Sequence, residues 1–83
     1  MPRFMDIHTG MKGIDQKQLA AAHARDRELE AVEGVTFLHA WADPKTGKVF
    51  CLSEGPDKEA VLRVHAKAGH ATTEIYEIPI DID

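Results

Sequence analysis

The histidines are the residues of this chain best suited to chemistry, because five of them occur among 83 residues that also include fourteen Asp and Glu. Imidazole nitrogen is a favoured donor for borderline divalent ions such as Ni²⁺, with carboxylate, thiolate or water completing four to six positions. Phe4 to His8 alternates apolar and polar residues, as a β-strand does. Asp6 and His8 are therefore expected on one strand face, about 7 Å apart between Cα atoms and able to converge on one ion. A hydrogen-bonded pair at a dimer seam is the alternative.

Two further pairs of candidate ligands lie on a predicted helix or at the end of one. His23 and Asp26 are three residues apart, so they are neighbours on a helix surface. An ion pair or a partly buried histidine is the alternative there. His65 and His70 lie on either side of a predicted helix end. The helix dipole at that end favours a cationic His70, which would compete with metal binding.

His39 is the remaining candidate ligand and stands between Phe37 and Trp41 in a predicted strand. It is either a core histidine that pairs with Glu54 or Glu77, or a polar group inside a pocket. The order of preference for metal ligands is His8 with Asp6, then His23 with Asp26, then His65 and His70.

The elements that must position these residues follow the order β-α-β-β-α-β. Asp15 and Gln18 suit a capping box at the start of the first helix, and Asp57 opens the second. Gly34 and Gly69 are typical stops after a helix. The turn segment DPKTGK joins the second and third strands into a hairpin. We expect strands over 4–8, 35–42, 48–54 and 73–80, and helices over 15–33 and 57–68.

This order of elements predicts an α+β fold in one domain over residues 1–83. Right-handed crossovers place the four antiparallel strands in the order 4-1-3-2, with both helices on one face. The prediction is a ferredoxin-like sandwich.

The hairpin register assigns side chains to the two faces of the predicted sheet. With Asp43 opposite Lys48, we expect Trp41 opposite Phe50, His39 opposite Leu52 and Phe37 opposite Glu54, all six on one face. The face without helices is then expected to carry Phe4, Asp6, His8, Phe37, His39, Trp41, Phe50, Leu52, Glu54, Ile75 and Glu77. Such an aromatic surface is too apolar to remain in water. A second copy of the sheet is the simplest cover, so we expect a homodimer in the form of a dimeric α/β barrel.

The composition excludes several other classes of protein. A net charge of −4 without a basic stripe argues against a nucleic-acid partner. No apolar run approaches 18 residues, which argues against a membrane span. The N-terminal segment lacks the apolar region of a signal peptide, and Cys51 has no second cysteine with which to form an internal disulfide. We therefore expect a cytoplasmic protein.

The segments FMDIH, AAAHARD, HAWADPKTGKVFCLSEGP, VLRVHAKAGH and EIYEIP occur in this order along the whole chain. Together they resemble a family of small bacterial ferredoxin-like domains, formerly of unknown function, of which some members are described as nickel-binding. The resemblance implies a dimer of α/β sandwiches with affinity for Ni²⁺, for metal sequestration or detoxification. Other divalent transition metals would suit the same donors.

An enzyme or a small-molecule-binding module is the alternative function. Dimeric barrels of this kind can enclose a pocket on the helix-free face, where a cofactor-free oxygenase or isomerase would act. The residues available there would be Asp6, His8, His39, Trp41 and Glu54. Because no nucleophile motif, phosphate loop or dinucleotide signature occurs, the sequence favours a binding protein over an enzyme.

Overall fold

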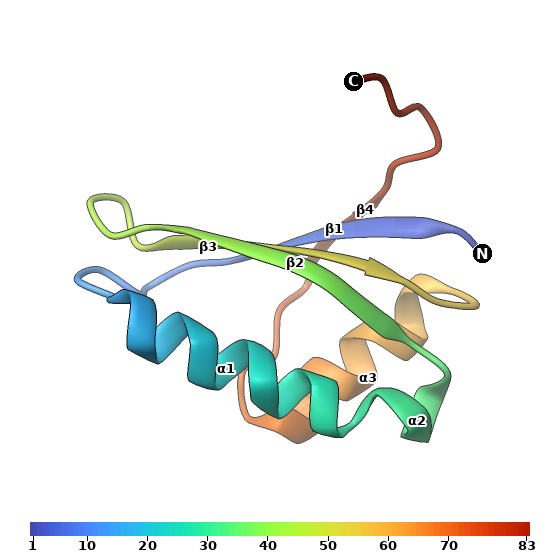
Figure 1. Cartoon of the computed structure of the whole chain (residues 1–83), viewed down its shortest axis with the longest axis horizontal. Coiled ribbons are helices and arrows are strands. Elements are labelled where there is room, and N and C mark those ends of the chain that lie inside the picture. The colour runs from blue at the N-terminus through green and yellow to red at the C-terminus, as the bar shows by residue number, and fades with distance from the viewer.

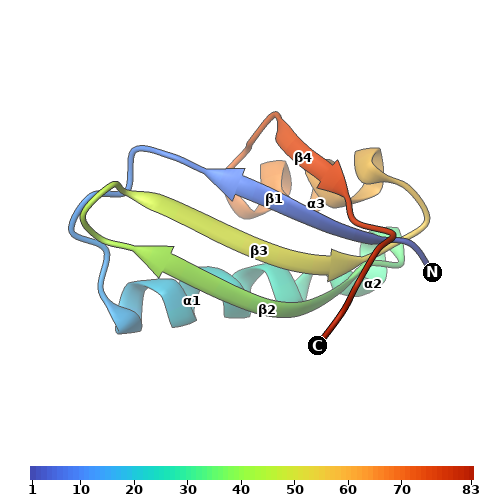
Figure 2. The same ribbon diagram turned by 90° about the horizontal axis from the view of Figure 1, so that it is seen from above.

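Strand β1 (Arg3–His8) lies inside a four-stranded antiparallel sheet in the computed structural model, which describes residues 1–83. The other strands are β2 (Thr36–Asp43), β3 (Lys48–Glu54) and β4 (Glu74–Glu77). Their order across the sheet is β2-β3-β1-β4, which is the predicted order read from the other edge (Figure 2). The ferredoxin-like prediction is confirmed.

Three helices cover one face of this sheet (Figure 1). They are α1 (Gln16–Glu28), α2 (Glu30–Glu33) and α3 (Lys58–Ala68). The predicted capping box of Asp15 and Gln18 starts α1, and the Asp57 carboxylate caps α3 by accepting from the Ala60 N–H. None of the three helices combines the length and apolar character of a membrane span.

The single first helix predicted over 15–33 is divided into α1 and α2 at Leu29. Leu29 leaves the helical conformation, with φ −101° and ψ 2°, and packs against the main apolar cluster. The break also lets the Glu30 carboxylate accept a hydrogen bond from the Phe37 N–H at 2.6 Å. Tertiary contacts therefore outweigh the local helix preference at this residue.

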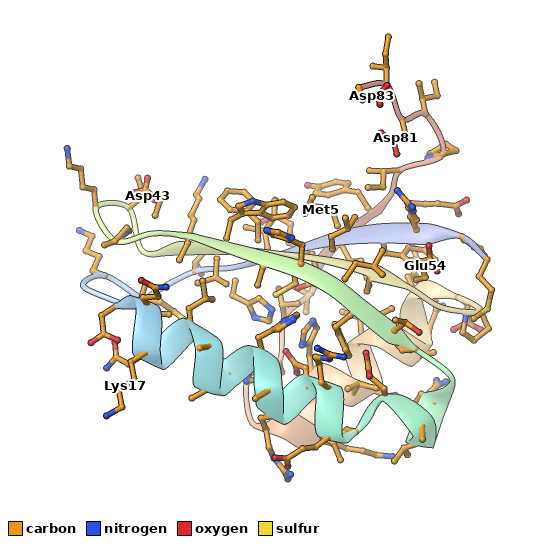
Figure 3. The ribbon with its side chains drawn as sticks, in the orientation of Figure 1. Met5, Lys17, Asp43, Glu54, Asp81 and Asp83 are labelled. Carbon is orange, nitrogen blue, oxygen red and sulfur yellow. The ribbon has the colours of Figure 1, made fainter.

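The prediction of which side of β1 and of β4 meets the helices is wrong. Phe4, Asp6 and His8 are buried beneath the helices, whereas Met5 points away from them (Figure 3). The register explains this, because Asp6 pairs with Cys51, and cross-strand partners share a face. Alternation shows which residues share a face but not which face receives the helices. Ile75 likewise packs against the core, so β4 is reversed too.

Phe37 also lies on the opposite face from the predicted one. A β-bulge between Phe37 and His39 changes the register of β2, so that Phe37 is opposite Ser53 rather than Glu54. Phe37 is consequently buried in the core, and Leu38 is 38% exposed. The pairings of His39 with Leu52 and of Trp41 with Phe50 are as predicted. We call the helix-free side of the sheet the open face; it carries Met5, Ile7, His39, Trp41, Phe50, Leu52 and Tyr76.

The buried apolar residues form two clusters between the sheet and the helices. The larger cluster comprises Phe4, Val35, Phe37, Ala60, Val61 and Val64, and the smaller one Ile14, Val49 and Cys51. Cys51 is a free, buried cysteine, and burial raises the pKa of its thiol. Polar side chains that would ordinarily be found at the surface share this interior.

The loop after β1 is fixed against the β2–β3 turn at Gly47. The Met11 N–H donates to the Gly47 carbonyl at 3.0 Å, and Gly47 itself has φ +77°. A Cβ added at Gly47 would lie 2.6 Å from the Lys12 nitrogen and 2.9 Å from the Met11 nitrogen. Glycine is therefore required here both by backbone conformation and by close approach.

We expect Gly47→Ala to destabilise the protein by more than about 2 kcal/mol, because left-handed strain of about 1–2 kcal/mol is joined by a clash with backbone atoms. Gly34→Ala is the matched control. The φ of Gly34 is +68°, but a Cβ there would meet nothing within 4 Å. Gly34→Ala should therefore lower the stability only by the backbone strain. Urea unfolding followed by circular dichroism measures both. Equal losses for the two variants would contradict the close approach at Gly47.

Candidate metal centre

His65 lies at the centre of a buried polar cluster between the sheet and the helices. Its Nδ1 is 3.0 Å from Asp26 Oδ1 on α1, and its Nε2 is 2.9 Å from Asp6 Oδ2 on β1. All three side chains are almost inaccessible to solvent. One imidazole on α3 thus connects the first strand with the first helix.

The charges of this trio follow from its geometry. Burial alone would lower the pKa of His65, but hydrogen bonds to Asp26 and Asp6 outweigh it and raise that pKa to about 9. Burial would raise the pKa of Asp6 and of Asp26, but the interactions with His65, joined by those of His8 with Asp6 and of His70 with Asp26, outweigh it and keep both pKa values below the usual range. At neutral pH His65 is therefore an imidazolium that donates an N–H to each carboxylate. Two carboxylates against one imidazolium leave one uncompensated negative charge.

Two more histidines contact these carboxylates: His70 shares Asp26 Oδ1 with His65, and His8 contacts the Asp6 oxygen that His65 leaves free. His70 Nε2 lies 2.7 Å from Asp26 Oδ1, to which its N–H can donate. His8 Nε2 lies 2.8 Å from Asp6 Oδ1, yet both atoms are buried without a partner in hydrogen-bond geometry. The rings of His8 and His70 have centroids 5.5 Å apart. A buried polar pair without hydrogen bonds is costly, and it needs an explanation such as a bound ion.

A cavity of about 40 Å³ adjoins this cluster on the α1 side. Its polar lining consists of His8, His23, Asp26, Cys51 and His70, and its apolar lining includes Met11, Ile14 and Leu19. His23 Nδ1 is also buried without a hydrogen-bond partner. A volume of this size holds a few waters or an ion with a water ligand.

The structure brings the three predicted ligand pairs into one place. The pairs Asp6–His8, His23–Asp26 and His65–His70 were treated as separate sites, but all six residues surround the cluster and its cavity. Sequence reasoning missed the closeness of Cys51 to Asp6. The β1–β3 register could have revealed it, because these two residues are cross-strand partners.

His39 is separate from the cluster. It is exposed on the open face, where its ring stacks on Trp41 with centroids 4.5 Å apart. Glu54, one of its expected partners, pairs with Arg3 at 3.2 Å instead. The alternative pocket on the helix-free face was expected to use Asp6 and His8, and that placement is wrong.

The donor set fits a transition-metal ion, with one exception. By distance, donor atoms converge in two groups, which are Asp6, His8, Cys51 and His65, and Asp26, His65 and His70. His65 is the exception, because both of its nitrogens are bonded to carboxylates and protonated. The free pair His8 Nε2 and Asp6 Oδ1 suits an ion better. Two ligands at right angles, each about 2.1 Å from one ion, lie about 3 Å apart, close to the spacing of this pair.

The His65 imidazolium should make the stability of the protein depend on pH. Its pKa of about 9 exceeds the unfolded value near 6.5, so its contribution is complete below pH 6.5 and is lost as pH rises to 9. Asp6 and Asp26 have the opposite effect on the pH dependence of stability. Their depressed pKa values stabilise the folded protein above about pH 4, and this contribution is lost as the pH falls further. We expect the free energy of unfolding to fall by a few kcal/mol between pH 6 and 9.5.

Urea unfolding at a series of pH values measures this dependence. His65→Gln should flatten the alkaline slope, and His39→Gln, at an exposed position, should leave it unchanged. A wild-type protein equally stable at pH 6 and 9.5 would contradict the assigned charge of His65, whether or not the His65 variant folds.

Comparison with known proteins confirms the resemblance found in the sequence. The model of the family described as nickel responsive protein SCO4226-like matches residues 4–78. The crystal structure of SCO4226 from Streptomyces coelicolor A3(2) matches with a TM-score of 0.94 and 52% sequence identity, over 96% of this chain and 99% of that one. No curated protein matches significantly. The chain therefore belongs to the SCO4226-like family of nickel-responsive proteins.

Proposed function

We propose that this protein binds a divalent transition-metal ion, Ni²⁺ in the first instance, in the interior cavity between α1 and the sheet. The proposed ligands are His8, His23 and His70, with carboxylate oxygens of Asp6 and Asp26 at the same site. The observation that carries the proposal is the presence of three imidazoles in the lining of one small cavity, with His8 Nε2, His23 Nδ1 and Asp6 Oδ1 buried without hydrogen-bond partners. The nickel-responsive family supports the choice of metal.

The charge of the cluster also favours a cation. Asp6 and Asp26 carry two negative charges and His65 one positive charge, so a divalent ion beside the carboxylates removes the excess negative charge. In the interior such an interaction is screened far less than at the surface. His65 then serves as a fixed cation that holds both carboxylates in place rather than as a ligand.

The position of the cavity favours retention of the ion over catalysis. The proposed ligands come from β1, from α1 and from the segment after α3, so the ion would be enclosed by the packed domain. An enclosed ion is shielded from other ligands in solution. We therefore infer a role in metal sequestration or detoxification.

Titration of chelator-stripped protein with Ni²⁺ by calorimetry tests this function. We expect His23→Gln to weaken binding about tenfold or more, because loss of a ligand costs at least as much as loss of an outer-shell partner. His39→Gln is the matched control and should bind as the wild type does. Binding should also fall between pH 7.5 and 5.5, because imidazole ordinarily titrates near pH 6.5 and only its neutral form is a ligand.

Two results would overturn the proposed site. One is unchanged binding in His8→Gln, His23→Gln and His70→Gln, with helix content verified by circular dichroism. The other is a wild type that binds no more Ni²⁺ than an unrelated protein with five histidines. Parallel titration with Cu²⁺ and Zn²⁺ is needed to interpret affinity, because nitrogen sites generally hold Cu²⁺ more tightly than Ni²⁺.

We further propose that the protein is a homodimer through the open face. With Phe4 and Phe37 in the core, the apolar character of this face rests on Trp41 and Tyr76, which are 43% and 54% exposed, and on half-buried Phe50. Met5, Ile7 and Leu52 add to it. An uncovered sheet face of this composition is typical of an interaction surface.

Sedimentation velocity at micromolar concentration should therefore give a dimer. Tyr76→Asp and Phe50→Asp should weaken the dimer about tenfold or more, because a charge would be buried at its centre. Val32→Asp is the control, since Val32 is 56% exposed on α2 and the substitution should leave association unchanged. A monomeric wild type would refute the dimer.

A further inference from the structure

The interior cavity is too small for a divalent ion that keeps its whole shell of water. Each water needs about 10–15 Å³ of cavity volume, so a shell of about six waters needs roughly 60–90 Å³. The cavity measures about 40 Å³. An ion must therefore exchange waters for protein ligands on its way in, and the place of that exchange has to be a larger space beside the cavity.

A groove of about 400 Å³ lies between the loop after β1 and the segment after α3. His8, Met11 and His70 line both this groove and the cavity, so these three side chains border both spaces. The groove also carries the exposed residues Thr9 and Thr73. Because hydroxyl groups both donate and accept hydrogen bonds, they can hold the waters of a hydrated ion. We call this space the entry groove.

His70 is the more accessible of the two histidines that border both spaces. Its side chain is 23% exposed, against 6% for His8. It follows the end of α3 and belongs to no helix or strand. The backbone around it is nevertheless fixed, because the His70 N–H donates to the His65 carbonyl at 3.0 Å and the Thr72 hydroxyl donates to the Ile7 carbonyl at 2.6 Å. The movable part is therefore the side chain of His70 rather than the segment.

The hydrogen bond that holds the His70 ring in place can be broken without leaving a buried charge unpaired. His70 Nε2 lies 2.7 Å from Asp26 Oδ1, and the same oxygen accepts from His65 Nδ1 at 3.0 Å. When His70 turns away, Asp26 keeps the His65 imidazolium, and the His70 ring bonds to water in the entry groove. Exchange of one such bond for bonds to water changes the free energy little. His65 has no such freedom, because both of its nitrogens serve buried carboxylates.

A second groove, between α1 and β2, also borders the cavity but is less suitable for an ion. It shares Leu19, His23 and Ala40 with the cavity, which are two apolar side chains and one imidazole. The His23 Nδ1 atom is buried, and α1 and β2 are regular elements. The entry groove instead offers two imidazoles in succession, so each can replace a water as the ion advances.

We propose that the ion enters and leaves the interior site through the entry groove, with the side chain of His70 as the gate. The ring turns away from Asp26, binds the hydrated ion in the groove and returns with it to the cavity, where His8 and Asp6 replace further waters. The inference rests on the metal-binding function proposed above and adds the route and its control. Because a gate changes the barrier and not the end states, it sets the rates of binding and release but not the affinity.

Obstruction of the entry groove tests the route. Ala71 is exposed, lines the entry groove and is not a proposed ligand, so Ala71→Trp should narrow the passage. Ala20→Trp is the matched control, because Ala20 is exposed in the groove between α1 and β2. Stopped-flow mixing of chelator-stripped protein with Ni²⁺, followed with a metal indicator dye, measures association, and excess chelator measures release. We expect both rates to fall at least tenfold in Ala71→Trp with Kd within twofold of wild type, and Ala20→Trp to keep the wild-type rates.

The mobility of His70 is measured on the metal-free protein. Diethyl pyrocarbonate modifies accessible neutral imidazoles, and peptide masses identify the modified residue. We expect His70 to react at least tenfold faster than His8, because its ring turns into the groove while His8 remains buried. Equal rates for the two histidines would overturn the gate.

The kinetic results separate the route from the function. Wild-type rates in Ala71→Trp, with Ni²⁺ bound at unchanged affinity, would overturn the route and leave the proposed function in place. Slower binding in Ala20→Trp alone would also overturn it, in favour of the groove between α1 and β2. A wild type that binds no Ni²⁺ would overturn both.

Discussion

The placement of one imidazolium between two carboxylates determines much of this structure. His65 on α3 donates to Asp6 on β1 and to Asp26 on α1, and all three are inaccessible to solvent. Removing any one partner would leave a buried charge without its counterpart, which is strongly destabilising. The arrangement fixes α1 and α3 relative to the central strand. It also requires Asp6 to face the helices, so the alternation of β1 turns Met5 and Ile7 to the open face.

The same cluster explains which parts of the fold were predictable from sequence. Strand order, the Asp15 capping box and the hairpin depend on local signals, such as caps, glycine stops and a tight turn, and these are readable in short segments. The faces of β1 and β4 were not readable in this way. A polar pair on a strand normally indicates the solvent side, whereas here Asp6 is stabilised by a partner 59 residues away. No local pattern contains that contact.

The candidate centre was predictable to a similar extent. Each ligand pair was identified from spacing along a strand or helix, which is local information. Their convergence depends on the packing of α1 and α3 over β1, and the unpartnered nitrogens of His8 and His23 become visible only in the packed interior. The bulge that moved Phe37 into the core has no glycine or proline to mark it, so the sequence offered no sign of it.

That bulge has a consequence for aggregation. Strand β2 is eight residues long and lies at the edge of the sheet, and a long regular edge can recruit copies of itself without limit. The register shift between Phe37 and His39 interrupts the edge near its start, so a straight strand from another molecule can pair only with the part that follows. Only a short segment then remains available, which limits the addition of further molecules along this edge.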